Sequence, residues 1–99
     1  MGRVYTSCEW IVKAGSENDF VVAWTALGAW AKEESPGSSW AVLLRDRDDP
    51  HRFVSFGPWE SDSALGACSA HPTFVSKLAA IGGLLERFRP QTLDEVAAH

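Results

Sequence analysis

The sequence predicts one α+β domain whose elements follow the order strand, helix, strand, strand, helix, strand. Its 99 residues suffice for a single domain with a thin core. Apolar residues alternate with polar ones or run together in segments of strand length, and elsewhere they recur at helical spacing. Glycine, proline and serine separate these segments. Residues 1–99 are therefore expected to form one domain.

The first strand is expected over residues 4–12, VYTSCEWIV. Strand alternation places Cys8, Trp10 and Val12 on one face, and it places Glu9 and Ile11 on the other, more polar face. The Lys-Ala-Gly-Ser sequence that follows ends the strand with a turn, and its serine is the expected N-cap of a helix.

The first helix is expected between this serine and the Ser-Pro-Gly sequence at residues 35–37, which stops it. Acidic residues at positions 17 and 19 suit the positive end of the helix dipole. Phe20, Trp24, Leu27 and Ala31 recur at helical spacing and form one apolar stripe. This stripe is predicted to face the core.

Two strands are expected next, at residues 39–46 and 53–57, joined by a loop of hairpin length. In residues 39–46 the even-numbered residues from Trp40 to Leu44 share one face. The other face carries Ala41, Leu43 and Arg45. Both faces contain apolar residues, and this pattern predicts burial on both sides.

The second helical region is expected in two parts. Ser61 is the expected N-cap of a short helix through Leu65 and Cys68, which the His-Pro pair at residues 71–72 breaks. A longer helix then carries apolar residues at positions 74, 78, 81 and 85, and Pro90 ends it. A final strand is expected over residues 92–98.

This order predicts a ferredoxin-like fold, which is one antiparallel sheet with helices on one face. The other face of the sheet is then bare, and Ile11, Ala41 and Leu43 are expected to lie on it. Because an exposed apolar face is typical of an interface, two subunits are expected to pack sheet against sheet as a homodimer. Strand alternation also assigns Glu9 and Arg45 to this face, where they are expected to satisfy each other.

Composition and spacing exclude several classes of function. The formal net charge is −4 without a basic stripe, which argues against nucleic-acid binding. The chain has no apolar run of membrane-spanning length and no signal-peptide core, so no membrane association is expected. Cys8 and Cys68 lack metal-ligand spacing and are too few for a disulfide scaffold, which predicts reduced thiols in a cytoplasmic protein and no metal site.

Three segments carry a resemblance to a known family: EWIVKAGSENDF at residues 9–20, LLRDRDDPHRFVSFGPWES at residues 43–61 and HPTFVSKL at residues 71–78. They resemble the antibiotic biosynthesis monooxygenase-like proteins of the dimeric α+β barrel superfamily. The resemblance implies a dimer built from two sheets and a pocket inside each subunit, between sheet and helices. The superfamily includes cofactor-free oxygenases of polyketide phenols, polyketide cyclases, haem-degrading enzymes and isomerases, so the fold alone does not select the reaction.

The residues that the haem-degrading branch uses are missing. That branch has an Asn on the first strand, a Trp at the end of the short helix and a His ligand in the next helix. The matching positions carry Cys8, Cys68 and Leu78, and a leucine cannot ligate iron. The resemblance therefore implies no haem, unless another residue such as His71 takes the ligand's place, and no cofactor is expected.

The oxygenase branch requires an apolar box, hydrogen bonds to a phenolate and the exclusion of water. Trp59 matches a tryptophan that members of this branch carry, whereas Ser55 and Leu65 stand where they have an Asn and a Tyr. Trp59 is expected to border the pocket beside Trp10 and Phe20 or Trp24. Cys8 and Cys68 are expected to face the same cavity from opposite walls, as buried free thiols.

Three functions remain open from the sequence. The first is cofactor-independent oxidation of an aromatic or polyketide-like small molecule by O₂, with Trp59 at the reaction site. The second is a cyclase or isomerase in which His71, near the pocket mouth, acts as the acid or base. The third is a dimer that binds a small apolar or aromatic ligand without catalysis.

Overall fold

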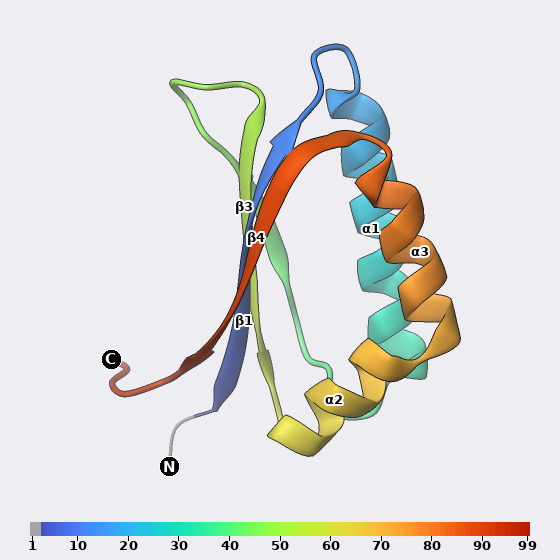
Figure 1. Ribbon diagram of the computed structural model, residues 1–99. Coiled ribbons are helices and arrows are strands. Elements are labelled where there is room, and N and C mark those ends of the chain that lie inside the picture. Colours follow the sequence, from blue (N-terminus) through green and yellow to red (C-terminus); the bar gives the residue numbers. More distant parts are fainter. Residues whose placement is uncertain (1–2) are drawn as a thin grey trace.

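The structure is a computed structural model that describes residues 3–99, in which three helices cover one face of a four-stranded antiparallel sheet (Figure 1). The elements are β1 (Val4–Val12), α1 (Glu17–Glu34), β2 (Val42–Arg45), β3 (Arg52–Trp59), α2 (Asp62–Ala70), α3 (Pro72–Gly82) and β4 (Leu85–Asp94). The strands lie in the order β2-β3-β1-β4. The predicted ferredoxin-like α+β fold, with its second helix divided in two, is confirmed.

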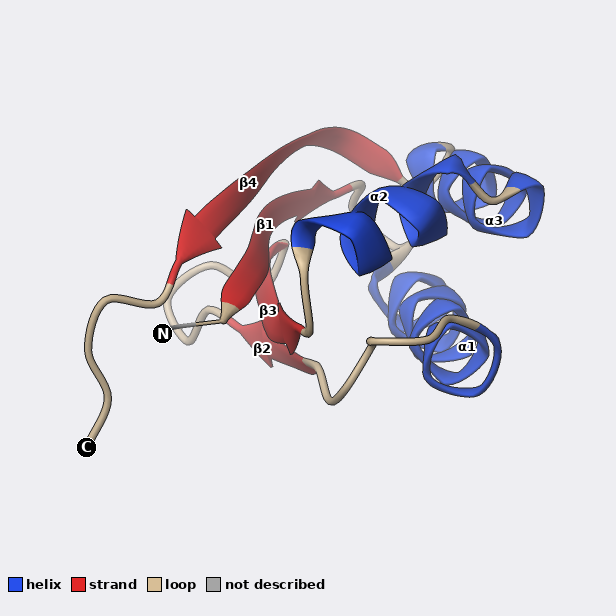
Figure 2. Ribbon diagram, turned by 90° about the horizontal axis from the view of Figure 1, so that it is seen from below, coloured by secondary structure: helices blue, strands red, loops and turns tan. Residues whose placement is uncertain are grey.

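The core lies between the helices and the two inner strands of the sheet, β1 and β3. On β1 the side chains of Cys8, Trp10 and Val12 are buried, as the alternation predicts. The register pairs Cys8 with Ser55 and Trp10 with Phe53, so the odd-numbered residues of β3 share the helix-covered face. Helices α1 and α3 lie side by side against this face (Figures 1 and 2). The first apolar stripe is confirmed, because α1 buries Phe20 and Leu27 and packs Trp24 against the core.

The ends of the helices follow local signals. Ser61 Oγ accepts a hydrogen bond from the Ala64 amide at 3.1 Å, so it is the predicted cap of α2. Ser16 occupies the cap position of α1, but its side chain makes no capping hydrogen bond. Gly15 has a φ of +88° in the turn before α1, a conformation that glycine adopts without steric cost.

The last strand begins earlier than predicted. Leu85 does not continue the stripe of a helix, because α3 ends at Gly82 and Leu85 is the first residue of β4. The Gly82-Gly83 pair weakens the helix at this point. Pro90 lies inside β4, opposite Cys8, where an edge strand tolerates its missing amide donor. Beyond Leu85 the strand is exposed and curves away from the helices (Figure 2).

The predicted orientation of the second strand is wrong. Strand β2 covers only Val42–Arg45, and its register pairs Leu43 with Ser55 and Arg45 with Phe53. Leu43 and Arg45 therefore face the helices, and Ala41 lies beside Gly57 on the same side. The register of a hairpin, which depends on its turn, decides which set of alternating residues faces the core. Sequence alternation defines the two sets without assigning them to a side.

Glu9 consequently has a different partner from the one predicted. The Arg52 Nε donates to Glu9 Oε2 at 2.7 Å, and Arg52 Nη1 donates to Asp46 Oδ2 at 3.0 Å. The Arg52 hydrogen bond holds the pKa of the Glu9 carboxyl below its ordinary value. The pKa of Asp46 is also lowered, first by the backbone amide of Asp48 and further by Arg52. These ion pairs lie on the bare face of the sheet.

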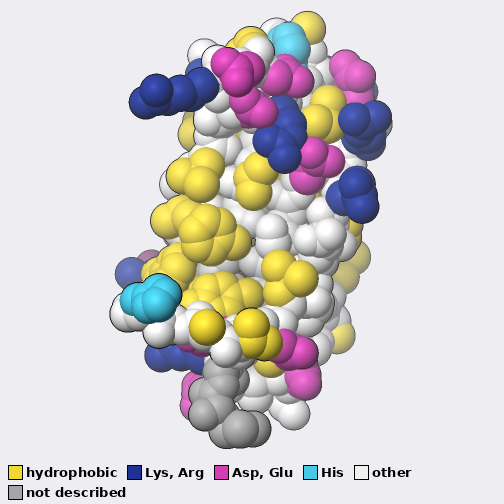
Figure 3. All heavy atoms as spheres, turned by 90° about the vertical axis from the view of Figure 1, so that its left-hand side faces the viewer, with side chains coloured by type: hydrophobic (Ala, Val, Ile, Leu, Met, Phe, Trp, Pro, Cys, Tyr) yellow, Lys and Arg dark blue, Asp and Glu magenta, His cyan; other side chains and the backbone are white. Residues whose placement is uncertain are grey.

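The bare face of the sheet carries a large apolar patch (Figure 3). Its exposed apolar residues are Trp40, Val42, Leu44, Phe56 and Leu93, with between 36% and 51% of their surface accessible. Trp40 packs edge-on against both Tyr5 and Phe56, at centroid distances of 6.3 and 5.9 Å. Charged side chains gather at the end of this face near the β2–β3 hairpin (Figure 3).

Candidate functional site

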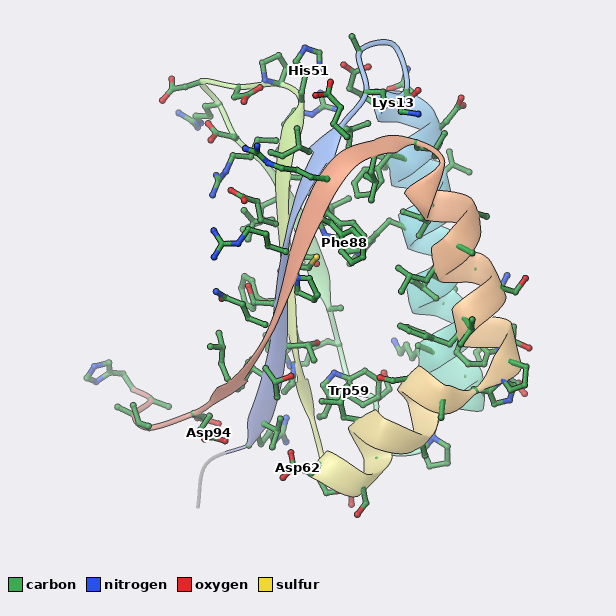
Figure 4. The ribbon with its side chains drawn as sticks, in the orientation of Figure 1. Lys13, His51, Trp59, Asp62, Phe88 and Asp94 are labelled. Atoms are coloured by element: carbon green, nitrogen blue, oxygen red, sulfur yellow. The ribbon has the colours of Figure 1, made fainter. Side chains whose placement is uncertain are left out.

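A row of aromatic rings crosses the helix-covered side of the sheet. Phe53 contacts Phe20 at a centroid distance of 5.0 Å, and Phe20 contacts Trp10 at 5.4 Å. Trp10 then stacks on Phe88 at 5.7 Å, with an angle of 15° between the rings. Trp10, Phe20 and Phe53 are buried, whereas Phe88 is 41% exposed. Phe88 lies in the space between sheet and helices (Figure 4).

An open groove of about 410 Å³ lies at the other end of this row, between α1 and the β2 edge of the sheet. Its lining residues are Val21, Trp24, Thr25, Leu43, Arg45 and Phe53. Phe53 belongs both to the groove and to the core, so the floor of the groove is continuous with the aromatic row. Of the residues predicted for the pocket, Trp24 lines this groove directly, and Phe20 packs against the groove residue Phe53.

Sequence reasoning missed Arg45 as a groove residue. Its guanidinium carbon lies 5.0 Å from the centroid of the Phe53 ring, which is the geometry of a cation–π contact. The residue is exposed at the mouth of the groove. The signal that could have found it is the alternation of β2 combined with a correct pairing to β3, because Arg45 and Phe53 are register partners.

Two indole–hydroxyl pairs lie farther along the same face of the sheet. Trp10 Nε1 donates to Ser55 Oγ at 2.9 Å, and both residues are buried. Trp59 Nε1 donates to Thr6 Oγ1 at 3.0 Å. Each hydroxyl accepts an indole N–H in these bonds and keeps its own O–H as a donor.

Trp59 is partly buried and lies in the space between the sheet and α2 (Figure 4). It is not among the residues that line the groove beside Trp24. The structure therefore does not bring Trp59 and Trp24 together around this groove. Leu65, the other residue predicted near it, lies on α2 and is partly buried.

Both cysteines are buried free thiols, as predicted. Cys8 is 8% exposed and Cys68 is 2% exposed. Burial raises the pKa of the Cys8 thiol to about 12. Neither thiol lines the groove between α1 and β2.

His71 lies at the junction of α2 and α3. Its Nδ1 accepts a hydrogen bond from the Thr73 amide at 3.1 Å, so the side chain is the N-cap of α3. Its ring packs edge-on against Trp30 at 4.9 Å. The residue is exposed and lies outside the groove.

Within residues 3–99 no three His, Cys, Asp or Glu side chains are grouped so that they could hold a metal ion. Over the same residues, no helix has the length and hydropathy needed to cross a bilayer. A second open groove, of about 400 Å³, lies on the bare face and is lined by Tyr5, Ser7, Phe56 and Leu93 together with Asp94, Glu95, Ala97 and Ala98.

Comparisons with known proteins extend these observations. The family profile described as antibiotic biosynthesis monooxygenase matches residues 4–76. SnoaB, a cofactor-independent oxygenase from Streptomyces nogalater, superposes with a TM-score of 0.90 at 20% identity, covering 99% of this chain and 97% of that one.

Two further solved structures share the fold. PA3566 from Pseudomonas aeruginosa has a TM-score of 0.82 at 21% identity, covering 98% of this chain and 97% of that one. A conserved protein from Methanosarcina mazei has a TM-score of 0.83 at 12% identity, covering 94% and 92%. No curated protein shows a significant sequence match to the chain.

Proposed function

Because the chain belongs to the antibiotic biosynthesis monooxygenase family, we propose that it oxidises an aromatic or polyketide-like small molecule with O₂ and without a cofactor. The observation that carries the proposal is the open groove between α1 and β2, where a planar ring would lie against Trp24. Its volume of about 410 Å³ lies within the range of small-molecule sites, which is about 300–1,000 Å³. The description of SnoaB as a cofactor-independent oxygenase agrees with this reaction class.

The reaction needs no external reductant when the substrate is a phenol whose keto tautomer contains a ring CH₂ group. Loss of one proton gives a delocalised carbanion, which supplies electrons to O₂ and forms a C–O bond. Loss of water then leaves a ketone. One O₂ accepts four electrons, one of its oxygen atoms enters the product and the other leaves as water.

The protein's part in this reaction is to bind the ring and orient it. We propose that a ring in the groove extends along β3 toward Ser55, which is the next residue on the same face after Phe53. The O–H of Ser55 is then a donor for the substrate's phenolate oxygen, because its oxygen already accepts the Trp10 indole. We further propose that Trp59, Leu65, Cys8 and Cys68 border the far end of a long substrate, toward α2.

The oxygenase proposal can be tested with a hydroxyanthrone as the probe. Purified protein, treated with a chelator, is expected to consume one O₂ for each anthraquinone formed and to transfer one atom of ¹⁸O from labelled O₂ into the product. Val21→Trp should fill the groove and abolish the activity. Its control is Val22→Trp on the same helix, because Val22 is 70% exposed. Binding of the probe without O₂ uptake would contradict the oxygenase and leave a binding protein.

A homodimer is the second part of the proposal. The apolar residues of the bare face, among them Leu44 and Phe56, are exposed in one subunit. We propose that the same face of a second copy covers them and that the interface buries more than about 1,200 Å² in total. Leu44→Asp is expected to give monomers in sedimentation, whereas Val22→Asp on the helical side is not. A wild-type monomer at micromolar concentration would contradict the dimer.

A further inference from the structure

We propose that Arg45 makes the groove between α1 and β2 selective for aromatic carboxylates, that is, for a ring that carries a carboxylate group. The inference rests on the proposed function insofar as this groove is the ligand site. It adds the chemical class of the ligand and the residue that selects it.

The position of Arg45 fixes its charge over the mouth of the groove. Strand pairing sets Arg45 opposite Phe53, and the guanidinium carbon lies 5.0 Å from that ring's centroid. This contact orients a side chain that would otherwise sample many rotamers. A ligand ring bound in the groove beside Trp24 would therefore present its edge to a cation that is already in place.

Arg45 has no carboxylate partner among residues 3–99. The ion pairs of this part of the chain join Arg52 to Glu9 and Asp46, and His51 to Glu17. Asp46 is adjacent to Arg45 in sequence, but it pairs with Arg52 instead. Arg45 therefore keeps its guanidinium N–H donors for a ligand, in a protein whose formal net charge is −4.

The rest of the groove favours the same ligand. Among residues 3–99, Arg45 is the only charged residue that lines it, and Val21, Trp24, Leu43 and Phe53 are apolar or aromatic. Thr25, which also lines the groove, donates its hydroxyl hydrogen bond to the Val21 carbonyl at 2.7 Å. A carboxylate at the mouth would thus find its donors on Arg45, whose planar fork matches a carboxylate in a bidentate contact.

The test compares two ligands that differ in charge and hardly in shape, 2-naphthoate and 2-naphthamide, by isothermal titration calorimetry. The wild-type protein is expected to bind the naphthoate at least about tenfold more tightly, as for a charge-assisted hydrogen bond. Arg45→Gln should remove this preference, and Arg45→Lys should restore part of it. Arg47→Gln is the matched control, because Arg47 is an exposed hairpin arginine outside the groove.

Three results would overturn the inference. Equal wild-type affinities for the two ligands would reduce Arg45 to a charge that protects an edge strand from unwanted pairing. An equal loss of both affinities in Arg45→Gln would mean that the side chain only shapes the groove. Oxidation of the hydroxyanthrone without binding of either naphthalene would place the substrate elsewhere and leave the oxygenase proposal standing. Selective naphthoate binding without any O₂ uptake would support the inference and refute the oxygenase.

Discussion

In the ligand-free protein, the main effect of replacing Ser55 by alanine is to remove the acceptor of a buried hydrogen bond. Trp10 and Ser55 are 5% and 8% exposed, and Trp10 Nε1 lies 2.9 Å from Ser55 Oγ. Alanine keeps the β-carbon, so no sizeable cavity forms, but the indole N–H is left buried without a partner. Such an unsatisfied donor costs about 1–3 kcal/mol. We therefore expect Ser55→Ala to lower the free energy of unfolding by about 2 kcal/mol.

Urea unfolding at a fixed protein concentration measures this loss, because oligomerisation would otherwise make the transition depend on concentration. With a urea m-value of about 1.5 kcal/mol per molar for a small domain, the midpoint should fall by roughly 1.3 M. The control is Ser69→Ala, an exposed serine on α2, where an effect within about 0.5 kcal/mol is expected.

A double-mutant cycle separates the hydrogen bond from other effects of the two substitutions. Trp10→Phe removes the donor, so the hydroxyl of Ser55 no longer matters for Trp10. Ser55→Ala should then cost about 2 kcal/mol less in the Trp10→Phe background than in the wild type. Additive losses, or a Ser55→Ala effect no larger than that of Ser69→Ala, would refute the assignment of this bond as a stabilising element.

Three further predictions concern the thiols, the ion pairs and the cap of α3. A thiol reagent is expected to modify Cys8 and Cys68 slowly in the native protein and rapidly in urea, because both are buried and the pKa of Cys8 is raised; rapid native labelling of both would be incompatible with their burial. The pKa values of Glu9 and Asp46 are lower in the folded protein than in the unfolded chain. Their ionised carboxylates therefore stabilise the fold at pH values above their unfolded-state pKa of about 4, and this stability is lost as the pH falls through the folded-state pKa. The melting temperature should therefore drop below pH 4, and a flat profile there would disprove this contribution. His71→Ala should lose about 0.5–2 kcal/mol with the cap, whereas His71→Asn should retain it; full stability but no activity in His71→Asn would indicate imidazole chemistry instead.

The fold could be predicted because its main signals are local. The alternation in residues 4–12 identified the buried face of β1 through Cys8, Trp10 and Val12, and Ser61 and the His-Pro pair marked the ends of α2 and α3. The orientation of β2 could not be predicted in this way, because it depends on the register with β3. The apolar residue Leu85 suits a helical stripe and a strand equally, so pairing with β1 decided its conformation.

The site was predicted in part for the same reason. Trp24 was recognised from the helical stripe, and it lines the groove. Strand alternation alone places Arg45 on the wrong face together with the rest of β2, so its contact with Phe53 could not be predicted from the sequence. Trp59 is the last residue of β3, and its indole donates a hydrogen bond to Thr6 on β1. Because the two residues are far apart in the sequence, no local pattern predicts this contact.

The position of β1 between β3 and β4 has a consequence for synthesis on the ribosome. β1 is translated before either neighbour, and β4 is the last strand of the sheet to be made. A nascent chain that has formed the β1–β3 pair still presents a nine-residue edge of β1, and open edges recruit other strands. Sheet completion must wait for Phe88 to reach Trp10 from the far end of the sequence, a non-local pairing of the kind that slows folding. Chains released before β4 is complete are thus the species most exposed to aggregation, and their clearance falls to chaperones and proteases.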